Sequence, residues 1–248
     1  MVSDLVSLGY RQEEGERIVK LLSQQEELSW YLNKAKQKDI FPITRVSQNY
    51  PHTLRKRLGS DCPGCLWAKG DITLLDTPMI GLVGSRELRE KNREFAREVG
   101  RRAAAQGYTL VSGNARGADR EAQEACLDAG GYVICVVADS LEEHALRQNV
   151  LYLSESGFDL PFSPYRALHR NRIVHSLPEK VFVAQCTLGR GGTWNGTTYN
   201  LQRAITPVFV YRDGSRAAAA LKNMGAQQVY PQDLRMIDAL GDMQTKIW

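Results

Sequence analysis

The sequence predicts an α/β protein with an extended Rossmann-like, doubly wound, mainly parallel sheet and a small helical region at the N-terminus. Short apolar runs rich in Val and Ile alternate with helical patterns, and the runs lack a strict apolar–polar alternation. Strands that are buried on both faces of a parallel sheet have this composition. Regular alternation of strand and helix also builds right-handed βαβ units, which stack into a doubly wound sheet.

The first 41 residues are expected to form short helices. Apolar residues recur at helical spacing near Leu5, Ile18 and Leu28, and Pro42 then interrupts the pattern. We therefore predict a helical region at 1–41, a Rossmann-like domain at 42–232 and a C-terminal tail at 233–248.

Five apolar runs are expected to be the strands of the sheet. They are residues 79–83, 108–111, 132–137, 181–184 and 207–211. Helical patterns at 87–106 and 119–129 fill two of the connections, and each is followed by glycine, the residue that most often ends a helix.

The composition excludes several classes of protein. Hydrophobic residues make up 43% of the chain and charged residues 24%, as in a globular protein with a real core. No apolar stretch approaches the roughly 18 residues of a membrane helix, and no basic segment followed by an apolar run marks a secretory signal. Five cysteines form an odd set that fits a reducing compartment better than a disulfide framework, so we expect a cytoplasmic protein without membrane contact.

The net charge of +4 is unevenly distributed along the chain. Residues 84–120 carry nine basic and five acidic side chains, and residues 165–190 carry five basic and one acidic, so each stretch is +4. This asymmetry indicates an anionic partner. For 86–102 the mixture of Arg and Glu fits an ordinary solvated helix face, whereas for 165–190 we favour a binding surface.

Three of the predicted strands lead into loops of Gly, Ser and Arg, each followed by a helix. The loops are Gly84-Ser85-Arg86, residues 112–119 and residues 186–193. Glycine lets backbone approach a ligand, and helix N-termini bind phosphate. Such a loop is also a common turn, but the carboxyl ends of parallel strands meet at one edge, so we expect the three loops to line one cleft.

Several segments resemble the signature segments of the DprA/Smf family of DNA-processing proteins. They are VGSR at 83–86, SGNARGADREAQEACLDAGG at 112–131, HRNRIV at 169–174, the upstream Tyr50-Pro51 and Lys69-Gly70-Asp71, and GGTWNGTTYNL at 191–201. The resemblance covers about residues 25–230. It implies the same extended Rossmann-like fold as the pattern of strands and helices.

The resemblance implies a homodimeric protein of DNA processing and recombination, used in natural transformation, repair or defence, and we expect no enzymatic activity. Such a protein protects single-stranded DNA in a basic pocket and loads the RecA recombinase. The residues implied to meet phosphates are Arg86, Arg116, Arg170 and Arg172. The other implied DNA-binding residues are Gly84, Ser85, Ser112, Gly113, Asn114, Gly117, Asn171, Gly191, Gly192 and Thr193. Trp194, Tyr199 and Tyr165 are candidates for base stacking, with core packing as the alternative, which we favour for the two tyrosines.

The chain also departs from the family pattern. Gln123 replaces the usual histidine, Gln185 replaces a common acid, and Gly196 and Thr197 replace Thr and Ala. The chain ends at Trp248, so we expect no winged-helix domain of the kind that some members carry.

The main alternative is a nucleotide-binding or nucleotide-sensing domain related to LOG-type phosphoribohydrolases. Their Gly-Gly-x-Gly-Thr-x-x-Glu motif is shorter than the segment here, and Asn200 occupies the position of the catalytic glutamate. An amide cannot act as a general acid or base, so we expect no catalysis. A dehydrogenase would need Gly-x-Gly-x-x-Gly after the first strand, and Gly84-Ser85-Arg86 does not supply it. Cys62 and Cys65 form one Cys-x-x-Cys without a second pair, so we expect neither a metal nor a cofactor.

Overall fold

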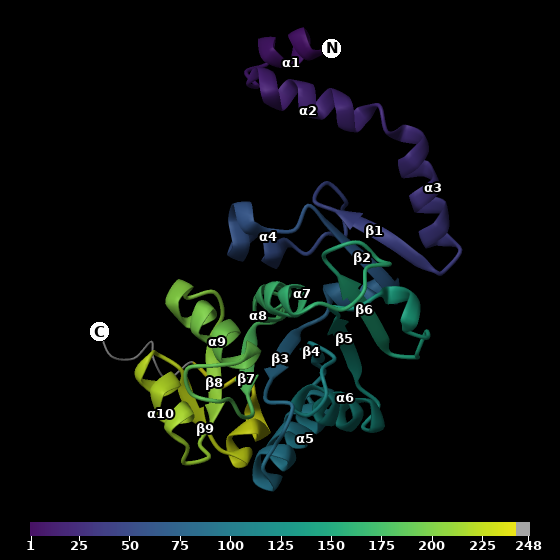
Figure 1. The fold of residues 1–248 in the computed structure, drawn as a ribbon. Helices are drawn as coiled ribbons and strands as arrows, with labels where there is room; N and C mark the ends of the chain where they lie inside the picture. Colours follow the sequence, from purple (N-terminus) through teal and green to yellow (C-terminus); the bar gives the residue numbers. More distant parts are fainter. Residues whose placement is uncertain (242–248) are drawn as a thin grey trace. The chain divides into compact units, whose positions relative to one another are not determined.

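The chain folds into two compact units, Met1–Phe41 and Pro42–Trp248. Figure 1 shows the computed structural model, which describes residues 1–241. Residues 242–248 of the predicted C-terminal tail lie outside the described residues. Within the described part of the chain, no helix is both long and apolar enough to cross a membrane.

The first unit contains the predicted N-terminal helices. They are α1 (Val2–Ser7), α2 (Gln12–Leu22) and α3 (Gln25–Lys36). Helix α1 packs against α2 at Gly15, where a Cβ atom would lie 3.3 Å from Cγ1 of Val2. Only Gly15 and Ala35 are buried in these three helices, so most of their apolar side chains are at least partly exposed.

A nine-stranded sheet forms the core of the second unit. Its strands lie in the order β1-β2-β6-β5-β4-β3-β7-β8-β9. Along this order, every pair of neighbouring strands between β6 and β9 is parallel, while β2 pairs antiparallel with β6. The strands are β1 (Ile40–Thr44), β2 (Cys65–Gly70), β3 (Met79–Val83), β4 (Thr109–Ser112), β5 (Tyr132–Val136), β6 (Val150–Ser154), β7 (Lys180–Val183), β8 (Val208–Tyr211) and β9 (Gln227–Val229). The predicted Rossmann-like, mainly parallel sheet is confirmed.

Four of these strands were not predicted from the sequence. Strand β6 is fully buried, but only the short 3-10 helix Leu141–Glu143 separates it from β5, so the alternation of strand and helix is lost there. Strand β1 contains Pro42, which the sequence suggested to be a break. Because β1 lies at the edge of the sheet, a proline is tolerated in it.

Helices cover the sheet (Figure 1). They are α4 (His52–Leu58), α5 (Glu90–Ala105), α6 (Ala118–Asp128), α7 (Pro164–His169), α8 (Asn171–Ser176), α9 (Gly192–Arg203) and α10 (Arg216–Asn223). Helix α5 packs against α6, and α8 packs against α9. The 3-10 helix Pro231–Met236 contacts α5 with Leu234 buried, so the first residues of the predicted tail pack onto the sheet domain.

The strand order reverses at β3. The chain runs from β3 through β4 and β5 to β6 in one direction, and from β7 through β8 to β9 in the other. Strands β3 and β7 are neighbours and parallel, so their carboxyl ends lie side by side. Ligands of open α/β sheets bind in the crevice at this topological switch point.

Candidate functional site

A cleft of about 870 Å³ lies at the switch point. The loops after β3 and β7, part of the loop after β4, helices α7 and α8 and the start of α9 all contribute to its wall. An adjoining hollow of about 430 Å³ extends along the loop after β4. The predicted residues that line the cleft are Gly84, Ser85, Arg86, Arg116, Arg170, Asn171, Gly191, Gly192 and Thr193. Gly113 and Asn114 line the adjoining hollow.

The loop after β3 is fixed by its neighbours. The Ser85 N–H donates to the carbonyl of Gln185, 2.9 Å away, and the Ser85 carbonyl accepts from the N–H of Ala118. A Cβ at Gly84 would lie 2.3 Å from Cβ of Ala118, so only glycine allows α6 to approach this closely. The Ser85 amide is therefore engaged inside the protein.

The loop after β4 folds around a carboxylate. Oδ2 of Asp119 accepts hydrogen bonds from the N–H groups of Gly113 (3.1 Å) and Ala115 (3.2 Å). Gly117 has a φ of +87°, and a Cβ there would lie 2.4 Å from the carbonyl oxygen of Arg86, so glycine is required on both grounds. This loop has the form of an anion-binding nest, and Asp119 occupies part of it. The predicted amide of Gly113 is thus already bonded.

Asp119 is buried and faces a buried arginine. Burial raises the pKa of Asp119 to about 6, against the opposing effects of the Arg170 charge and the two N–H bonds. The guanidinium of Arg170 fills the space beside Gly113, where Nη1 would lie 1.6 Å from an added Cβ. Arg170 therefore supports the loop from within, and only a small part of it reaches the cleft.

The four predicted phosphate-binding arginines differ in their surroundings. The side chain of Arg116 is 75% exposed and lies 3.9 Å from Glu87. Arg86 is also exposed, and within residues 1–241 it makes no ion pair and no side-chain hydrogen bond. Arg172, by contrast, is held by Glu155 and by the carbonyl of Asp61.

The structure adds Arg190, which is not among the predicted binding residues. Arg190 lines the cleft, is exposed, and has no side-chain partner in the described part of the chain. It follows a strand and precedes the Gly191-Gly192 pair, so its position in the loop was the available signal. Arg86, Arg116 and Arg190 thus bring three exposed guanidinium groups from three loops to one cleft.

The N-terminus of α9 points its first amides at the same cleft. Gly191 is the N-cap, with a φ of +90°, and Gly192 and Thr193 follow as the first helical residues. The first N–H groups of a helix have no partner within it, and they carry a partial positive charge. The Thr193 hydroxyl donates to the Gly84 carbonyl (2.8 Å) and so joins α9 to the loop after β3.

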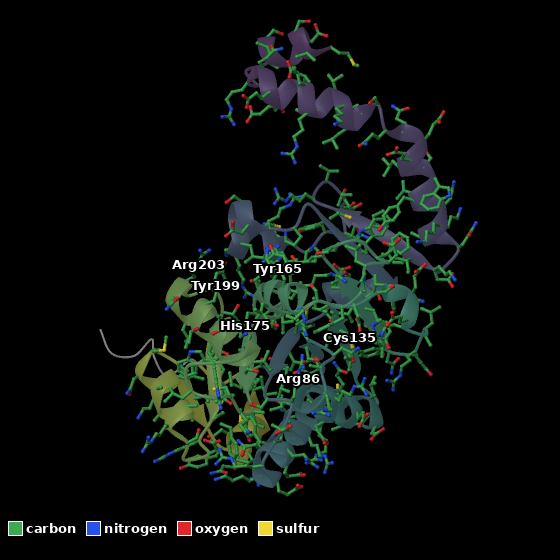
Figure 2. All side chains as sticks on the ribbon, viewed as in Figure 1. Arg86, Cys135, Tyr165, His175, Tyr199 and Arg203 are labelled. Atoms are coloured by element: carbon green, nitrogen blue, oxygen red, sulfur yellow. The ribbon has the colours of Figure 1, made fainter. Side chains whose placement is uncertain are left out.

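The predicted aromatic residues lie outside the main cleft. Tyr165 is 72% exposed and stacks on His169, so the core-packing alternative is wrong for it. Tyr199 lines a separate hollow beside Arg203, and Trp194 is half-buried on α9. Figure 2 shows Tyr165 and Tyr199 on different elements from Arg86.

One aromatic residue of the cleft was missed. Phe162 is 51% exposed and lines both the cleft and the adjoining hollow. It stands alone between Pro161 and Ser163, outside any periodic pattern, so the sequence offered no signal beyond its presence near the basic segment.

Two residues that the motif comparisons singled out have internal roles: Asn200, which stands at the place of the LOG-type glutamate, and Gln123, which departs from the DprA/Smf pattern. Asn200 is buried, its Nδ2 lies 3.1 Å from Nδ1 of His175, and its Oδ1 accepts from the Thr206 N–H (2.9 Å). Burial, with the nearby Arg170 charge, lowers the pKa of His175 to about 4. Gln123 donates to the hydroxyl of Ser112, which is fully buried in β4.

The five cysteines are free thiols, and none of them is among the residues that line the cleft. Sγ of Cys62 lies 2.8 Å from the hydroxyl of Tyr50, and no disulfide joins it to Cys65. Across the described residues, no group of three or more His, Cys, Asp or Glu side chains is placed to hold a metal ion.

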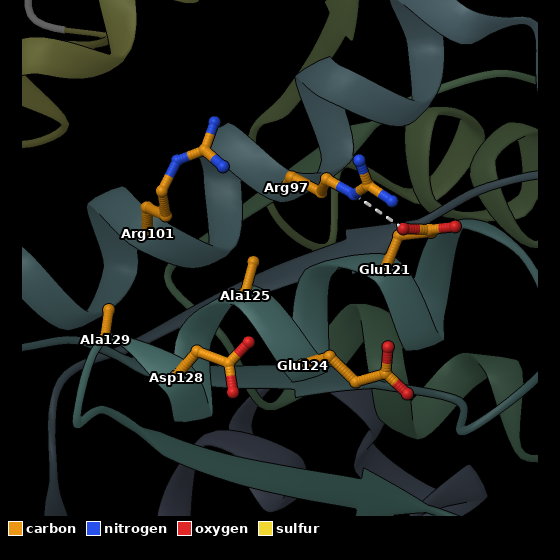
Figure 3. Close-up of a pocket in the computed structure, with 7 residues that line it drawn as sticks. All are labelled: Arg97, Arg101, Glu121, Glu124, Ala125, Asp128 and Ala129. Carbon is orange, nitrogen blue, oxygen red and sulfur yellow. Dashed lines mark hydrogen bonds and ion pairs between the residues drawn. The ribbon is translucent and has the colours of Figure 1, made fainter.

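A further hollow of about 400 Å³ lies between α5 and α6 (Figure 3). Arg97 and Glu121 meet across it at 2.7 Å, and Glu124 and Asp128 follow along α6. On α5 itself, Arg101 and Arg102 pair with Glu98. The basic residues of this region are largely neutralised, as expected for a solvated helix face.

Comparison with known proteins agrees with the fold. Residues 42–239 match the family model described as DNA recombination-mediator protein A. Protein Smf of Escherichia coli is 31% identical over 160 residues, which cover 60% of this chain and 42% of that protein. The match to DprA of Bacillus subtilis covers 54% of that protein, so the chain spans about half the length of these relatives.

Two solved structures of DNA processing protein A are similar. The protein from Streptococcus pneumoniae superposes with a TM-score of 0.75 and 25% identity, covering 94% of this chain and 85% of that one. The protein from Helicobacter pylori, which binds single-stranded DNA, superposes with a TM-score of 0.67 and 26% identity, covering 79% of this chain and 94% of that one. On the family match over residues 42–239, this chain belongs to the DprA/Smf family of DNA recombination-mediator proteins.

Proposed function

We propose that this chain binds single-stranded DNA in the cleft at the switch point. The observation that carries the proposal is the meeting of Arg86, Arg116 and Arg190, from three separate loops, around one hollow. Exposed guanidinium groups bind phosphate through paired N–H donors. Membership of the family and the DNA-binding relative from Helicobacter pylori support DNA as the anionic partner.

Phosphates would lie between the exposed arginines and the N-terminus of α9. The amides of Gly192 and Thr193 are the free donors of this helix end. The predicted amides of Ser85 and Gly113 are bonded within the protein, so we assign them to shaping the loops. The backbone contribution to binding then comes mainly from α9.

Bases would lie at the rim of the cleft. Binding of a single strand without sequence preference needs flat side chains beside a positive groove. Phe162 lines the cleft and Tyr165 is exposed on α7, so both are available for stacking. Trp194 stays a weaker candidate because it is half-buried.

Arg170 and Arg172 are proposed to position the site. Arg170 supports the loop after β4 beside Asp119, and Arg172 links α8 to Glu155 and Asp61. Both keep the shape of the cleft, with little of either side chain exposed for DNA.

We propose binding without catalysis. Asp119, the buried carboxylate of the cleft, accepts two backbone N–H bonds and faces Arg170, which commits it to the loop. Handing the strand to RecA, protecting it, dimerisation and a cytoplasmic location are further parts of this proposal, and they are supported by membership of the family.

Titration of a labelled single-stranded oligonucleotide by fluorescence anisotropy at several salt concentrations tests the proposal. We expect tight binding with a steep salt dependence, and weaker binding of the matching duplex. Replacing Arg116 by Ala should reduce affinity for all sequences and lower the salt slope by about 1, because one phosphate contact is lost.

The matched control is Arg216→Ala, which removes an exposed arginine that does not line the cleft. It should leave both the affinity and the salt slope unchanged. If the oligonucleotide does not bind but a mononucleotide saturates the protein, the DNA proposal is wrong and a nucleotide-sensing domain replaces it.

A further inference from the structure

A second hollow of about 480 Å³ adjoins the cleft on the side of α9. Leu168 and Asn171 line both hollows, so they form the ridge between them. The far wall of the second hollow carries Tyr199 and Arg203, which lie side by side on α9 in Figure 2. A DNA strand that occupies the cleft has only this ridge to cross to reach the second hollow.

Arg203 is held in place as a flat platform. Its Cζ lies 4.5 Å from the centre of the Tyr199 ring, as expected for neighbours at i and i+4 on a helix. Nη1 donates to the Tyr199 hydroxyl (2.9 Å) and to Oδ2 of Asp61 (3.1 Å). The side chain is nevertheless 57% exposed, so a large part of the guanidinium stays open to a ligand.

The charge of this platform is compensated at close range, whereas among the cleft arginines Arg116 reaches Glu87 only at 3.9 Å, and Arg86 and Arg190 have no ion pair within residues 1–241. Asp61 pairs with Arg203 and is itself 53% exposed. A phosphate brought to this point would meet the carboxylate as well as the guanidinium. The face of a nucleobase, which is uncharged, stacks well on a planar guanidinium or an aromatic ring.

We propose that the second hollow is a subsite for a nucleobase of the bound strand, stacked on the Arg203–Tyr199 pair. This inference rests on the proposed binding of single-stranded DNA. The volume of the hollow falls in the usual range for sites of small ligands, roughly 300–1,000 Å³. Gly196, which lines the hollow, lets α9 lie close to α8, because a Cβ there would lie 3.1 Å from Nε2 of His175 and 3.2 Å from Cβ of Asn171.

The subsite is tested by Arg203→Lys, which keeps the ion pair with Asp61 but removes the flat group. The probes are a labelled thymidine oligonucleotide of about twelve nucleotides and an abasic oligonucleotide of the same length. We expect Arg203→Lys to weaken binding of the thymidine strand by about tenfold, with the salt slope unchanged. Binding of the abasic strand should not change, since it has no base to stack.

The matched control is Arg212→Lys. Arg212 lies over the Tyr230 ring at 5.3 Å, the same kind of pair, and it lines neither hollow. It should bind both strands like the parent protein.

The remaining outcomes overturn the inference in different ways. Unchanged affinity of Arg203→Lys for the thymidine strand, while Arg116→Ala weakens binding, removes the base subsite and leaves the proposed function standing. Equal weakening for the thymidine and abasic strands assigns Arg203 to the backbone, which is also against stacking. If the parent protein binds neither strand, the proposed function itself fails and the subsite fails with it.

Discussion

Arginines of the loops after β3, β4 and β7 differ sharply from the arginines of helices α7 and α8. Arg86, Arg116 and Arg190 are exposed on the cleft, and within residues 1–241 the one ion pair among them is the 3.9 Å contact of Arg116 with Glu87. Arg166 and Arg170 are buried, as is most of the Arg172 side chain. The two groups carry the same charge, but only the first can meet a ligand without breaking an internal contact.

The buried group holds loops together. Arg166 donates to the carbonyls of Leu160, Pro161 and Ser156 and to the hydroxyl of Ser154, and so fixes the loop that carries Phe162. The positive charge of residues 165–190 is therefore largely used inside the protein. The preference for a binding surface at 165–190 therefore does not hold for Arg166, Arg170 and Arg172, whose side chains are mostly buried.

Replacing Arg170 by Met should give the largest effect. It removes the buried cation whose charge acts on Asp119 and whose guanidinium fills the space beside Gly113. A buried charge left without compensation costs about 3 kcal/mol of the free energy of unfolding. Urea denaturation followed by circular dichroism measures the loss. The double variant Asp119→Asn, Arg170→Met should recover part of it, because no unpaired buried charge remains.

A loss below about 1 kcal/mol in Arg170→Met, the range of an exposed ion pair, would remove the distinction between the two groups of arginines.

The pH dependence of stability should separate Asp119 from His175. The pKa of Asp119 is raised to about 6, so its contribution is full below about pH 4 and is lost as the pH rises through 6. The pKa of His175 is lowered to about 4, so its contribution is full above its ordinary value of 6.5 and is lost as the pH falls through 4. Each amounts to about 1–3 kcal/mol at most.

Unfolding free energies of Asp119→Asn and His175→Gln, measured against the parent from pH 4 to 7, test these signs. The free energy of unfolding of Asp119→Asn, minus that of the parent, should increase as the pH rises. The same difference for His175→Gln should increase as the pH falls. Parallel curves for the two variants would show that at least one of the groups is not perturbed as the structure indicates.

Replacing Arg190 by Ala should give the smallest effect on stability. An exposed side chain without a partner contributes within about 0.5 kcal/mol, so the denaturation midpoint should not move. Its loss should still lower the salt slope of oligonucleotide binding by about 1. A clear loss of stability with unchanged binding would place Arg190 in the same class as Arg170.

Much of the fold could be predicted because its signals are local. The five predicted strands are buried on at least one face along most of their length, and such strands form continuous apolar runs. Four strands were missed. Strand β1 contains a proline, and β9 is only three residues long. Only a short 3-10 helix separates β2 from β3, and another separates β5 from β6, so the alternation of strand and helix is lost there. Their places in the sheet depend on pairing with distant segments.

The candidate site was predicted in outline and changed in detail. Gly-, Ser- and Arg-containing loops after parallel strands predicted one cleft, and nine of the named residues do line it. The sequence could not show that Asp119 would accept the Gly113 amide, that Gln185 would take the Ser85 amide, or that Phe162 would reach the rim.

By itself the sequence determined the class of fold, the glycines that loops require, and membership of the DprA/Smf family. These depend on the order of residue types along the chain. Only the tertiary structure decided which arginines are free, because burial depends on how distant segments pack. Arg170 fills the space beside Gly113, and Arg172 is held by Glu155 and by the carbonyl of Asp61. A guanidinium is available to a ligand only where the packing of the fold leaves it exposed.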